Sequence, residues 1–381
     1  MKIVYAYHNI ANVGGAGKII IDKMNLLAEN YDYEIYLITY SQGKHDFCYP
    51  LSNKVKHIDI GVPFHLQYKY KYLKKLWLKW YYSTLFKRKI KKQIDIIDPD
   101  ILIGLANDAG CPVCKIKSRA KKITESHVAK FKKNHRETST DNLFKMIFLF
   151  INAKWRQHII EKYSDVVVCL TKGDVKEWEK ANKVAIIPNT IHHGPVTTNH
   201  NKTNRVLSIG RLTPLKGFDR LINAWKIINN RHPEWELLII GEGECKSALQ
   251  KQIVQNKLEG AIKIHPFTSQ ITEEYLKSSI FVLASRYEGF GLVLAEAMAC
   301  GVPCISFDCP YGPSDIIKNK EDGLVIENGN IKQLADSICY LIENKHIREV
   351  YGEKARQNIA RYYPENIMPQ WDQLFKQLVN G

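Results

Sequence analysis

Two glutamates lie in the window of the sequence that is best suited to chemistry. The window covers residues 285–303 and reads SRYEGFGLVLAEAMACGVP. A strand is predicted at 280–284, then a turn that carries Glu288, then a helix from about residue 291. Glu296 stands about one and a half turns into that helix, so the two carboxylates are predicted to point into one pocket from different heights. Taken singly, either residue also fits an acidic helix start or an exposed helical glutamate.

Glycines shape this turn. Gly289 and Gly291 let the backbone approach a ligand closely, and the start of the helix offers unpaired N–H groups to an anion. Gly301, with Pro303 beyond it, is expected to end the helix. The window therefore predicts a site for an anionic ligand beside two carboxylates.

The elements that position this window form two α/β halves. Short apolar runs alternate with helix-period segments along the chain, a pattern typical of parallel sheets built from βα units. A polar stretch at 190–204 is the predicted linker between two Rossmann-like sheets. Because ligands of open α/β sheets bind beyond the carboxyl ends of the strands, a cleft is expected between the sheets. The predicted strands are 2–7, 34–39, 101–105, 122–125, 166–170 and 184–187, then 206–210, 236–241, 262–265, 280–284 and 304–307.

Length and composition are those of a two-domain globular protein. The chain has 381 residues, 45% of them hydrophobic and 25% charged, which excludes wholesale disorder and fibrous repeats. No stretch approaches the roughly 18–20 apolar residues of a membrane span, and the first strand is too short for a signal-peptide core. A cytoplasmic protein is therefore expected.

The cysteines favour reduced thiols over a disulfide framework, because the nine of them are odd in number and scattered. Cys111 and Cys114 have the spacing of half a zinc site. No second pair of ligands stands at a suitable distance from them, so no metal is predicted.

The positive charge lies almost wholly in the first half of the chain. Residues 1–195 carry 33 Lys and Arg against 18 Asp and Glu, whereas the remainder carries 22 against 21. Such a one-sided excess predicts an anionic partner for the first half, which can be a nucleic acid, an anionic membrane or an acidic substrate.

A basic aromatic segment, residues 66–92, concentrates this charge. It holds ten Lys and Arg, no acidic residue and eight aromatic residues. Apolar residues recur in it at helical spacing, with lysines on the other side: Leu73, Leu76, Trp77, Trp80 and Leu85. Basic faces flanked by Trp and Tyr suit the headgroup level of an anionic membrane. Two alternatives remain, a solvated helix whose aromatic residues pack on their own domain and a surface for single-stranded nucleic acid.

Taken together, the motifs resemble a known family. Glu288 and Glu296 form an E-x7-E motif whose surroundings are similar almost residue for residue to those of retaining glycosyltransferases of the GT-B fold, family 4 (glycosyl transferases group 1). The resemblance covers the whole chain, is strongest over 205–330, and points to transferases of bacterial surface polysaccharides and lipid-linked glycans. Further motifs stand in family order: Gly14-Gly15-Ala16, Ile187-Pro188-Asn189, Gly210-Arg211-Leu212, Lys216-Gly217, the run 308–317 and Asp322-Gly323-Leu324.

The resemblance implies an α/β protein of GT-B architecture, with two facing Rossmann-like domains and a cleft between them. Residues 1–195 would form the acceptor-binding domain, including the membrane-facing segment 66–92. Residues 203–362 would bind the nucleotide sugar, and a C-terminal helix at 363–381 would cross back to the first domain.

The resemblance also assigns roles at the donor site. Arg211 and Lys216 would bind the donor diphosphate, where two fixed cations stabilise the charge that develops on the leaving nucleotide. Glu288 would contact the hydroxyls of the donor sugar, and Glu296 those of the nucleotide ribose. The other donor-binding residues implied are Gly14, Gly15, Gly289, Phe290, Gly291, Leu292 and Thr268. Family members are usually metal-independent, so no cofactor is expected.

A histidine from the first half completes the implied catalytic set. His127 follows the fourth predicted strand in Thr124-Glu125-Ser126-His127. Relatives that act on lipid-linked sugars carry Ser-Glu-His or a similar sequence there, with the histidine facing the reacting phosphate, whereas this chain has Glu-Ser-His. An ordinary loop histidine is the alternative interpretation.

The resemblance therefore implies a retaining transferase that moves a hexosyl residue from a nucleotide-diphosphate sugar, expected to be UDP-linked. The basic first half favours a membrane lipid-linked saccharide of a surface polysaccharide as acceptor. The protein would then lie peripherally on the inner, cytoplasmic face of the cell membrane. Two rival hypotheses are a GT-B sugar-nucleotide epimerase or a transferase acting on a soluble protein, and, more distantly, a nucleic-acid-binding protein.

Overall fold

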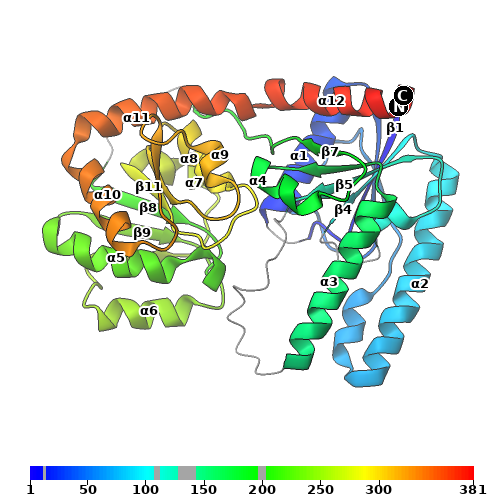
Figure 1. Cartoon of the computed structure of the whole chain (residues 1–381), viewed down its shortest axis with the longest axis horizontal. Coiled ribbons are helices and arrows are strands. Elements are labelled where there is room, and N and C mark those ends of the chain that lie inside the picture. The colour runs from blue at the N-terminus through cyan, green and yellow to red at the C-terminus, as the bar shows by residue number, and fades with distance from the viewer. Residues whose placement is uncertain (12–13, 107–111, 128–142, 196–202) are drawn as a thin grey trace.

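Two parallel sheets lie side by side along the long axis of the molecule (Figure 1). The computed structural model describes residues 1–11, 14–106, 112–127, 143–195 and 203–381. Within these ranges, a seven-stranded sheet precedes a six-stranded sheet, and every pair of neighbouring strands runs parallel. The predicted α/β class with two Rossmann-like sheets is confirmed.

The first sheet has the strand order β3-β2-β1-β4-β5-β6-β7. Its inner strands are apolar on both faces because helices cover both sides, and β6 is buried along its whole length. The strands are β1 Lys2–Tyr7, β2 Glu34–Thr39, β3 Lys56–Asp59, β4 Ile101–Leu105, β5 Lys121–Ser126, β6 Val166–Cys169 and β7 Val184–Ile186. The helices are α1 Gly15–Asn30, α2 Tyr72–Ile97, α3 Leu143–Tyr163 and α4 Lys172–Val175, with a 3-10 turn η1 at Phe64–Lys69 before α2.

The second sheet has the strand order β10-β9-β8-β11-β12-β13. Its strands are β8 Arg205–Ile209, β9 Glu236–Ile240, β10 Ile262–His265, β11 Ile280–Leu283, β12 Cys304–Phe307 and β13 Gly323–Ile326. Its helices are α5 Phe218–Arg231, α6 Lys246–Gln255, α7 Ile271–Lys277, α8 Leu292–Ala299, α9 Pro313–Ile316, α10 Ile331–Glu343 and α11 Lys345–Asn358, followed by α12 Pro364–Asn380.

The predicted strands are all present, with bounds that differ by at most one residue at each end. Two further strands, β3 and β13, were not predicted. Both are four-residue strands at an outer edge of a sheet. β3 has the sequence KHID, which is neither a continuous apolar run nor strictly alternating, and β13 opens on a glycine, so neither has a strong sequence signal.

Both sheets reverse their strand order next to their first strand, between β1 and β4 and between β8 and β11. Loops that leave the carboxyl ends of strands on either side of such a point diverge and leave room for a ligand. Gly14 and Gly15 follow β1, Arg211 and Lys216 follow β8, and Glu288 follows β11. The topology therefore brings the predicted residues of each half to one end of its sheet.

The chain returns to the first domain at its C-terminus. Figure 1 shows α11 and α12 running along the top of both sheets, back towards the first domain. Trp371 and Phe375 of α12 are buried, and the Tyr33 hydroxyl before β2 hydrogen-bonds the Asp372 carboxylate. α12 thus packs on the first sheet although it follows the second in sequence.

Gly217 holds the start of α5 in place. Its φ of 66° is left-handed, and an added Cβ would lie 2.0 Å from the Ala284 carbonyl oxygen. We expect Gly217→Ala to lower the free energy of unfolding by about 1–3 kcal/mol or more, because backbone strain and overlap add. Thermal unfolding measures this loss. Gly260→Ala, where the added Cβ meets nothing within 4 Å, is the matched control and should change little.

Candidate active site

The glycine-rich turn between β11 and α8 places Glu288 against a cation. Gly291 caps α8 with a left-handed φ of 99°, which a side chain rarely adopts. The Glu288 backbone N–H donates to the Pro310 carbonyl at 3.0 Å, which fixes the turn. Lys216 Nζ and Ser285 Oγ both donate to Glu288 Oε1, each at 2.6 Å. The Glu288 side chain is only 8% exposed, so its carboxylate has lost most of its contact with water. The bonds from Lys216 and Ser285 replace that contact.

The two predicted cations differ in their surroundings. Lys216 is half-buried and engaged with Glu288, whereas the Arg211 side chain is exposed. Arg211 has no ion-pair partner among the residues that the structure describes. The site therefore holds one cation positioned by a carboxylate and a second that is open to an anionic ligand.

Glu296 has a separate partner. Its Oε2 accepts a hydrogen bond from the Tyr275 hydroxyl at 3.1 Å. Burial raises the pKa of Glu296, and the charge of Lys18 and the Tyr275 hydrogen bond only partly oppose this. Lys18 belongs to α1, so a charge of the first domain acts on a carboxylate of the second.

The Gly14–Gly15 loop lies against the start of α8. A Cβ added to Gly15 would stand 3.1 Å from Cδ1 of Leu292, so the two domains nearly touch here. The Tyr49 hydroxyl accepts a hydrogen bond from the Gly14 N–H at 2.9 Å and anchors the loop from behind. Two residues predicted from distant parts of the sequence, Gly15 and Leu292, are thereby brought together.

His127 lies at the end of β5 within a buried ionic network. Its Nε2 is 2.6 Å from Glu125 Oε2, and the other oxygen of Glu125 is 2.5 Å from Lys23 Nζ. Burial alone would raise the pKa of Glu125, but Lys23 and His127 outweigh it and hold that pKa well below its usual range. The carboxylate therefore stays ionised at neutral pH.

The other predicted residues are less directly placed. Phe290 is 3% exposed and packs edge-on against Tyr362, with ring centres 5.3 Å apart, so its ring supports the turn. Gly289 beside it is half-buried. Thr268 follows β10, two strands from β8, and its hydroxyl accepts a hydrogen bond from the Gln270 N–H at 3.1 Å. No contact joins Thr268 to the Glu288 group among the described residues.

The sequence prediction missed the residues that support the site. Tyr275 reaches Glu296 from α7, 21 residues away in the sequence, whereas Ser285 is only three residues from Glu288, within the same window. The burial of Lys23 could have been predicted, because it stands on the same helical face as the apolar residues Ile20, Met24 and Leu27. A lysine in such a stripe must find a buried anion, and that anion is Glu125.

The described ranges contain no group of three His, Cys, Asp or Glu side chains that could hold a metal ion. They also contain no helix long and apolar enough to cross a membrane. The eight described cysteines form no disulfide, and Cys111 of the CxxC pair lies outside the described residues.

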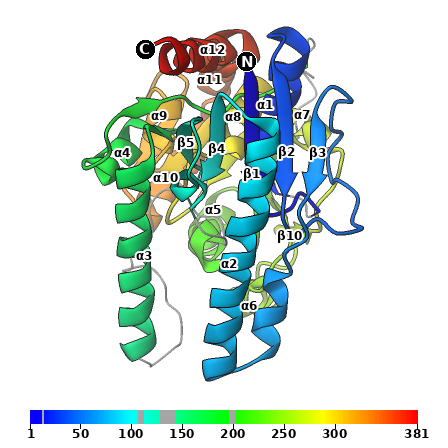
Figure 2. The same cartoon turned by 90° about the vertical axis from the view of Figure 1, so that its right-hand side faces the viewer.

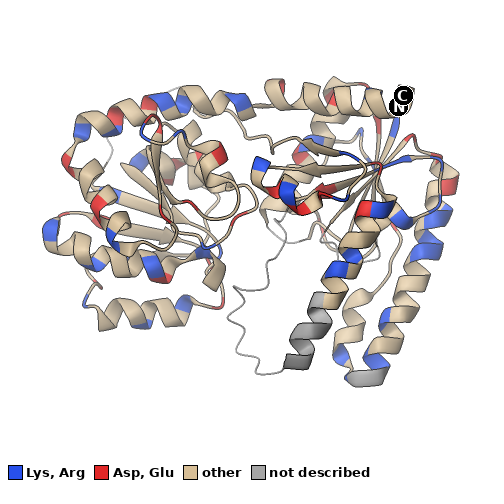
Figure 3. Cartoon of the chain, in the orientation of Figure 1, with Lys and Arg blue, Asp and Glu red and all other residues tan. Residues whose placement is uncertain are grey.

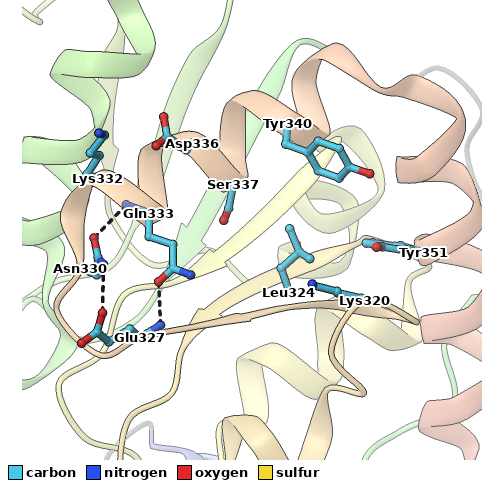
Figure 4. Close-up of a pocket in the computed structure, with 10 residues that line it drawn as sticks. All are labelled: Lys320, Leu324, Glu327, Asn330, Lys332, Gln333, Asp336, Ser337, Tyr340 and Tyr351. Atoms are coloured by element: carbon cyan, nitrogen blue, oxygen red, sulfur yellow. Dashed lines mark hydrogen bonds between the residues drawn. The ribbon is translucent and has the colours of Figure 1, made fainter.

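A cavity of about 740 Å³ opens on the second domain, between β13 and α10 (Figure 4). Polar side chains line it, among them Glu327, Asn330, Asp336 and Ser337. A smaller cavity of about 530 Å³ lies next to it, beside Asp308 and Lys318. Neither cavity is lined by any of the predicted site residues.

We expect Glu296→Gln to raise the melting temperature of the ligand-free protein at neutral pH. The pKa of Glu296 is higher in the folded protein than in the unfolded chain, so the unfolded state releases its proton first as pH rises. The folded protein therefore loses stability between the unfolded and folded pKa values, and the variant avoids this loss.

Below pH about 4, where both states are protonated, the two proteins should melt alike. Thermal unfolding across pH measures the effect, with the exposed Glu259→Gln as control. Equal melting temperatures at neutral pH would contradict the assigned burial cost of Glu296.

The second half of the chain is similar to known glycosyltransferases. Residues 194–358 match the family described as Glycosyl transferases group 1. An uncharacterized glycosyltransferase of Haemophilus influenzae is 32% identical over 213 residues, which cover 54% of this chain and 60% of that protein. The amylovoran biosynthesis glycosyltransferase AmsD of Erwinia amylovora is 38% identical over 173 residues, 45% of this chain and 48% of AmsD. The chain thus spans less than two thirds of the length of these relatives.

The whole fold is shared with solved structures. A TarM mutant of Staphylococcus aureus, solved in complex with Fondaparinux, alpha-GlcNAc-glycerol and UDP, superposes with a TM-score of 0.74 at 18% identity. The match covers 98% of this chain and 99% of the TarM chain. It shows the GT-B arrangement of two Rossmann-like domains. Over residues 194–358, the chain is therefore similar to the glycosyl transferases group 1 family.

Proposed function

We propose that this protein is a retaining glycosyltransferase that moves a hexosyl residue from a UDP-linked sugar to a lipid-linked saccharide in surface polysaccharide biosynthesis. The observation that carries the proposal is the Lys216–Glu288 ion pair beside the open Arg211, on loops after β8 and β11. AmsD, a relative, is named for amylovoran biosynthesis, and the TarM structure contains UDP. Both support a nucleotide-sugar donor and a polysaccharide product.

The two cations suit a diphosphate leaving group. Glu288 holds Lys216 by a 2.6 Å ion pair, so the ammonium is oriented before the donor arrives. Arg211 adds a planar guanidinium that can bind phosphate oxygens in pairs. Preorganised cations stabilise the charge that develops as the nucleotide departs, which is the main contribution that such a site can make without a metal.

The environment of Glu288 favours retention without a covalent intermediate. One oxygen of its carboxylate already accepts from an ammonium and a hydroxyl, which lowers its reactivity as a nucleophile. The other oxygen can accept from a sugar hydroxyl and orient the donor. The departing phosphate would then deprotonate the acceptor on the same face of the sugar.

Arg211→Ala should lower the turnover of sugar transfer by about 10²-fold or more, by analogy with removal of one oxyanion donor. Lys216→Ala should do the same and should also lower stability, because Glu288 is left buried without its cation. The measurement is kcat for transfer or hydrolysis of UDP sugars, with Lys226→Ala on the exposed face of α5 as control. Near-normal kcat in both variants at the site would rule out the assigned phosphate contacts.

The basic aromatic segment supports the membrane part of the proposal. Figure 2 shows α2 projecting from the first sheet beside α3, and Figure 3 shows basic residues along α2. Leu78, Tyr82 and Phe86 face the domain and are buried, so the packing alternative holds for them. Trp77 and Trp80, in contrast, are 57% and 66% exposed among lysines.

Exposed tryptophans beside lysines fit a membrane interface better than free solvent. Lysine ammonium groups attract anionic headgroups, while indole rings enter the interfacial layer. Lys74, Lys75 and Lys79 are exposed on the same part of α2 as Trp77 and Trp80. We assign this surface, rather than the second domain, to docking on an anionic membrane, and the first domain to the acceptor.

Replacing Lys74, Lys75, Lys79 and Lys87 with Glu should release the protein from anionic vesicles, because each basic residue near such a surface contributes roughly 1 kcal/mol. Vesicle flotation at physiological salt measures this. The control changes the exposed lysines 226, 251, 257 and 332 of the second domain to Glu, an equal change of charge, and should leave binding intact.

Activity on a short water-soluble acceptor should survive in both lysine-to-glutamate variants. If the wild-type protein does not bind anionic vesicles, the membrane assignment is contradicted and a soluble acceptor is favoured. Salt-dependent binding of single-stranded nucleic acid without binding of sugar nucleotides would favour the nucleic-acid hypothesis instead.

A further inference from the structure

A buried lysine lies behind the predicted catalytic histidine. Lys23 of α1 is 3% exposed and is surrounded by the apolar core of the first domain. Burial lowers its pKa, and Glu125 opposes that shift. Burying a lysine is costly unless its charge is paired, so its presence calls for a function.

The ammonium of Lys23 has two partners on different elements. Glu125 of β5 accepts at 2.5 Å, and the Trp371 ring of α12 lies with its centre 3.9 Å from Nζ. The Tyr5 ring is 5.4 Å away. A cation over an indole face is attracted by the ring electrons, most strongly where water is excluded. The C-terminal helix therefore covers the lysine that holds Glu125.

Glu125 in turn decides which nitrogen of His127 carries hydrogen. An ionised carboxylate only accepts hydrogen bonds, so His127 Nε2, at 2.6 Å from Oε2, must be the donor. The second imidazole nitrogen, Nδ1, has no hydrogen-bond partner among the described residues and is then available to a ligand. Without such a partner the two neutral forms of imidazole interconvert freely.

We propose that Lys23 and Glu125 form a positioning pair that fixes the hydrogen of His127 on Nε2 and presents Nδ1 to the donor. The catalytic consequence rests on the proposed function, whereas the state of the imidazole does not. Lys23 balances the charge of Glu125, which lets the buried carboxylate stay ionised and accept a hydrogen bond from His127. Among the described residues, the charged or titratable groups that face Glu125 are Lys23, His127 and the buried Tyr5.

The direct test follows His127 by NMR in protein labelled with ¹⁵N-histidine. Its two ring signals are identified by their loss in His127→Gln. In the wild-type protein the neutral form should carry hydrogen on Nε2 alone. Glu125→Gln should yield a mixture of both forms, because an amide can donate as well as accept. A mixture already present in the wild type would overturn the proposal.

Lys23→Met tests the charge balance. Once the ammonium is gone, Glu125 attracts the imidazolium more strongly, so the midpoint of the His127 titration should move to higher pH. The double variant Lys23→Met, Glu125→Gln removes both charges, so it leaves no unpaired buried charge and can be studied if the single variant fails to fold. In the double variant the midpoint of the His127 titration should not rise. A titration midpoint that is equal in the wild type and in the Lys23→Met variant would contradict the assigned pair.

The role of α12 is tested with two variants, each of which removes one contact of this helix. Trp371→Leu removes the ring over Lys23 and should shift the His127 signals in the direction of Lys23→Met, by less. Tyr33→Phe removes a different contact of the same helix, the bond to Asp372, and should leave the signals in place. Equal shifts in both would mean that general loosening of α12, not the lysine contact, moves His127.

Kinetics separate this inference from the proposed function. Glu125→Gln should lower kcat for sugar transfer by roughly 10- to 100-fold, as when an orienting partner is lost, with the donor KM changed less than about threefold. If NMR bears out the pair but His127→Ala transfers sugar like wild type, the pair positions a residue that the reaction does not use. The error then lies in the proposed role of His127.

Discussion

The site of this protein depends on the common direction of its strands. In a parallel sheet all carboxyl ends meet at one edge, so loops after distant strands can converge without any long insertion. Gly15 after β1, Lys216 after β8 and Glu288 after β11 are each carried there by short connections. The close approach of Gly15 to Leu292 then joins the edges of both sheets. A Cβ at position 15 would lie 3.1 Å from Cδ1 of Leu292, so the Leu292 side chain would have to shift slightly.

Charge compensation follows the same plan in both domains. In each, a lysine holds a carboxylate that has little access to water: Lys216 with Glu288, and Lys23 with Glu125. Exclusion of water weakens the screening of each ion pair, so the two charges attract more strongly. It also means that a buried charge without its partner would lower the free energy of unfolding. Among the described residues Glu296 has no lysine at bonding distance, and burial raises its pKa. Its burial therefore carries a cost to folding that no close ion pair offsets.

The fold could be predicted from the sequence to a large extent because its strands are apolar runs with clear ends. β6, four buried residues in succession, is an example, whereas the edge strand β3 has no such run. The E-x7-E window and its glycines also gave the turn before α8, since Gly291 adopts the left-handed conformation there. The pairs of side chains that contact each other could not be predicted. The sequence around Lys216 does not indicate that its ion-pair partner is Glu288, 72 residues away.

α12 is the element that makes the first domain depend on the end of the chain. Because Trp371 covers Lys23, the helix closes a chain of contacts that runs through Glu125 to His127. Lys172 N–H also donates to Asp315, and the Tyr311 hydroxyl to Glu177, so the two domains are tied at a second place by polar contacts. Polar contacts at a domain interface break and re-form more easily than apolar ones. The contact of α12 with the first domain is built differently, because the buried rings of Trp371 and Phe375 make most of it apolar.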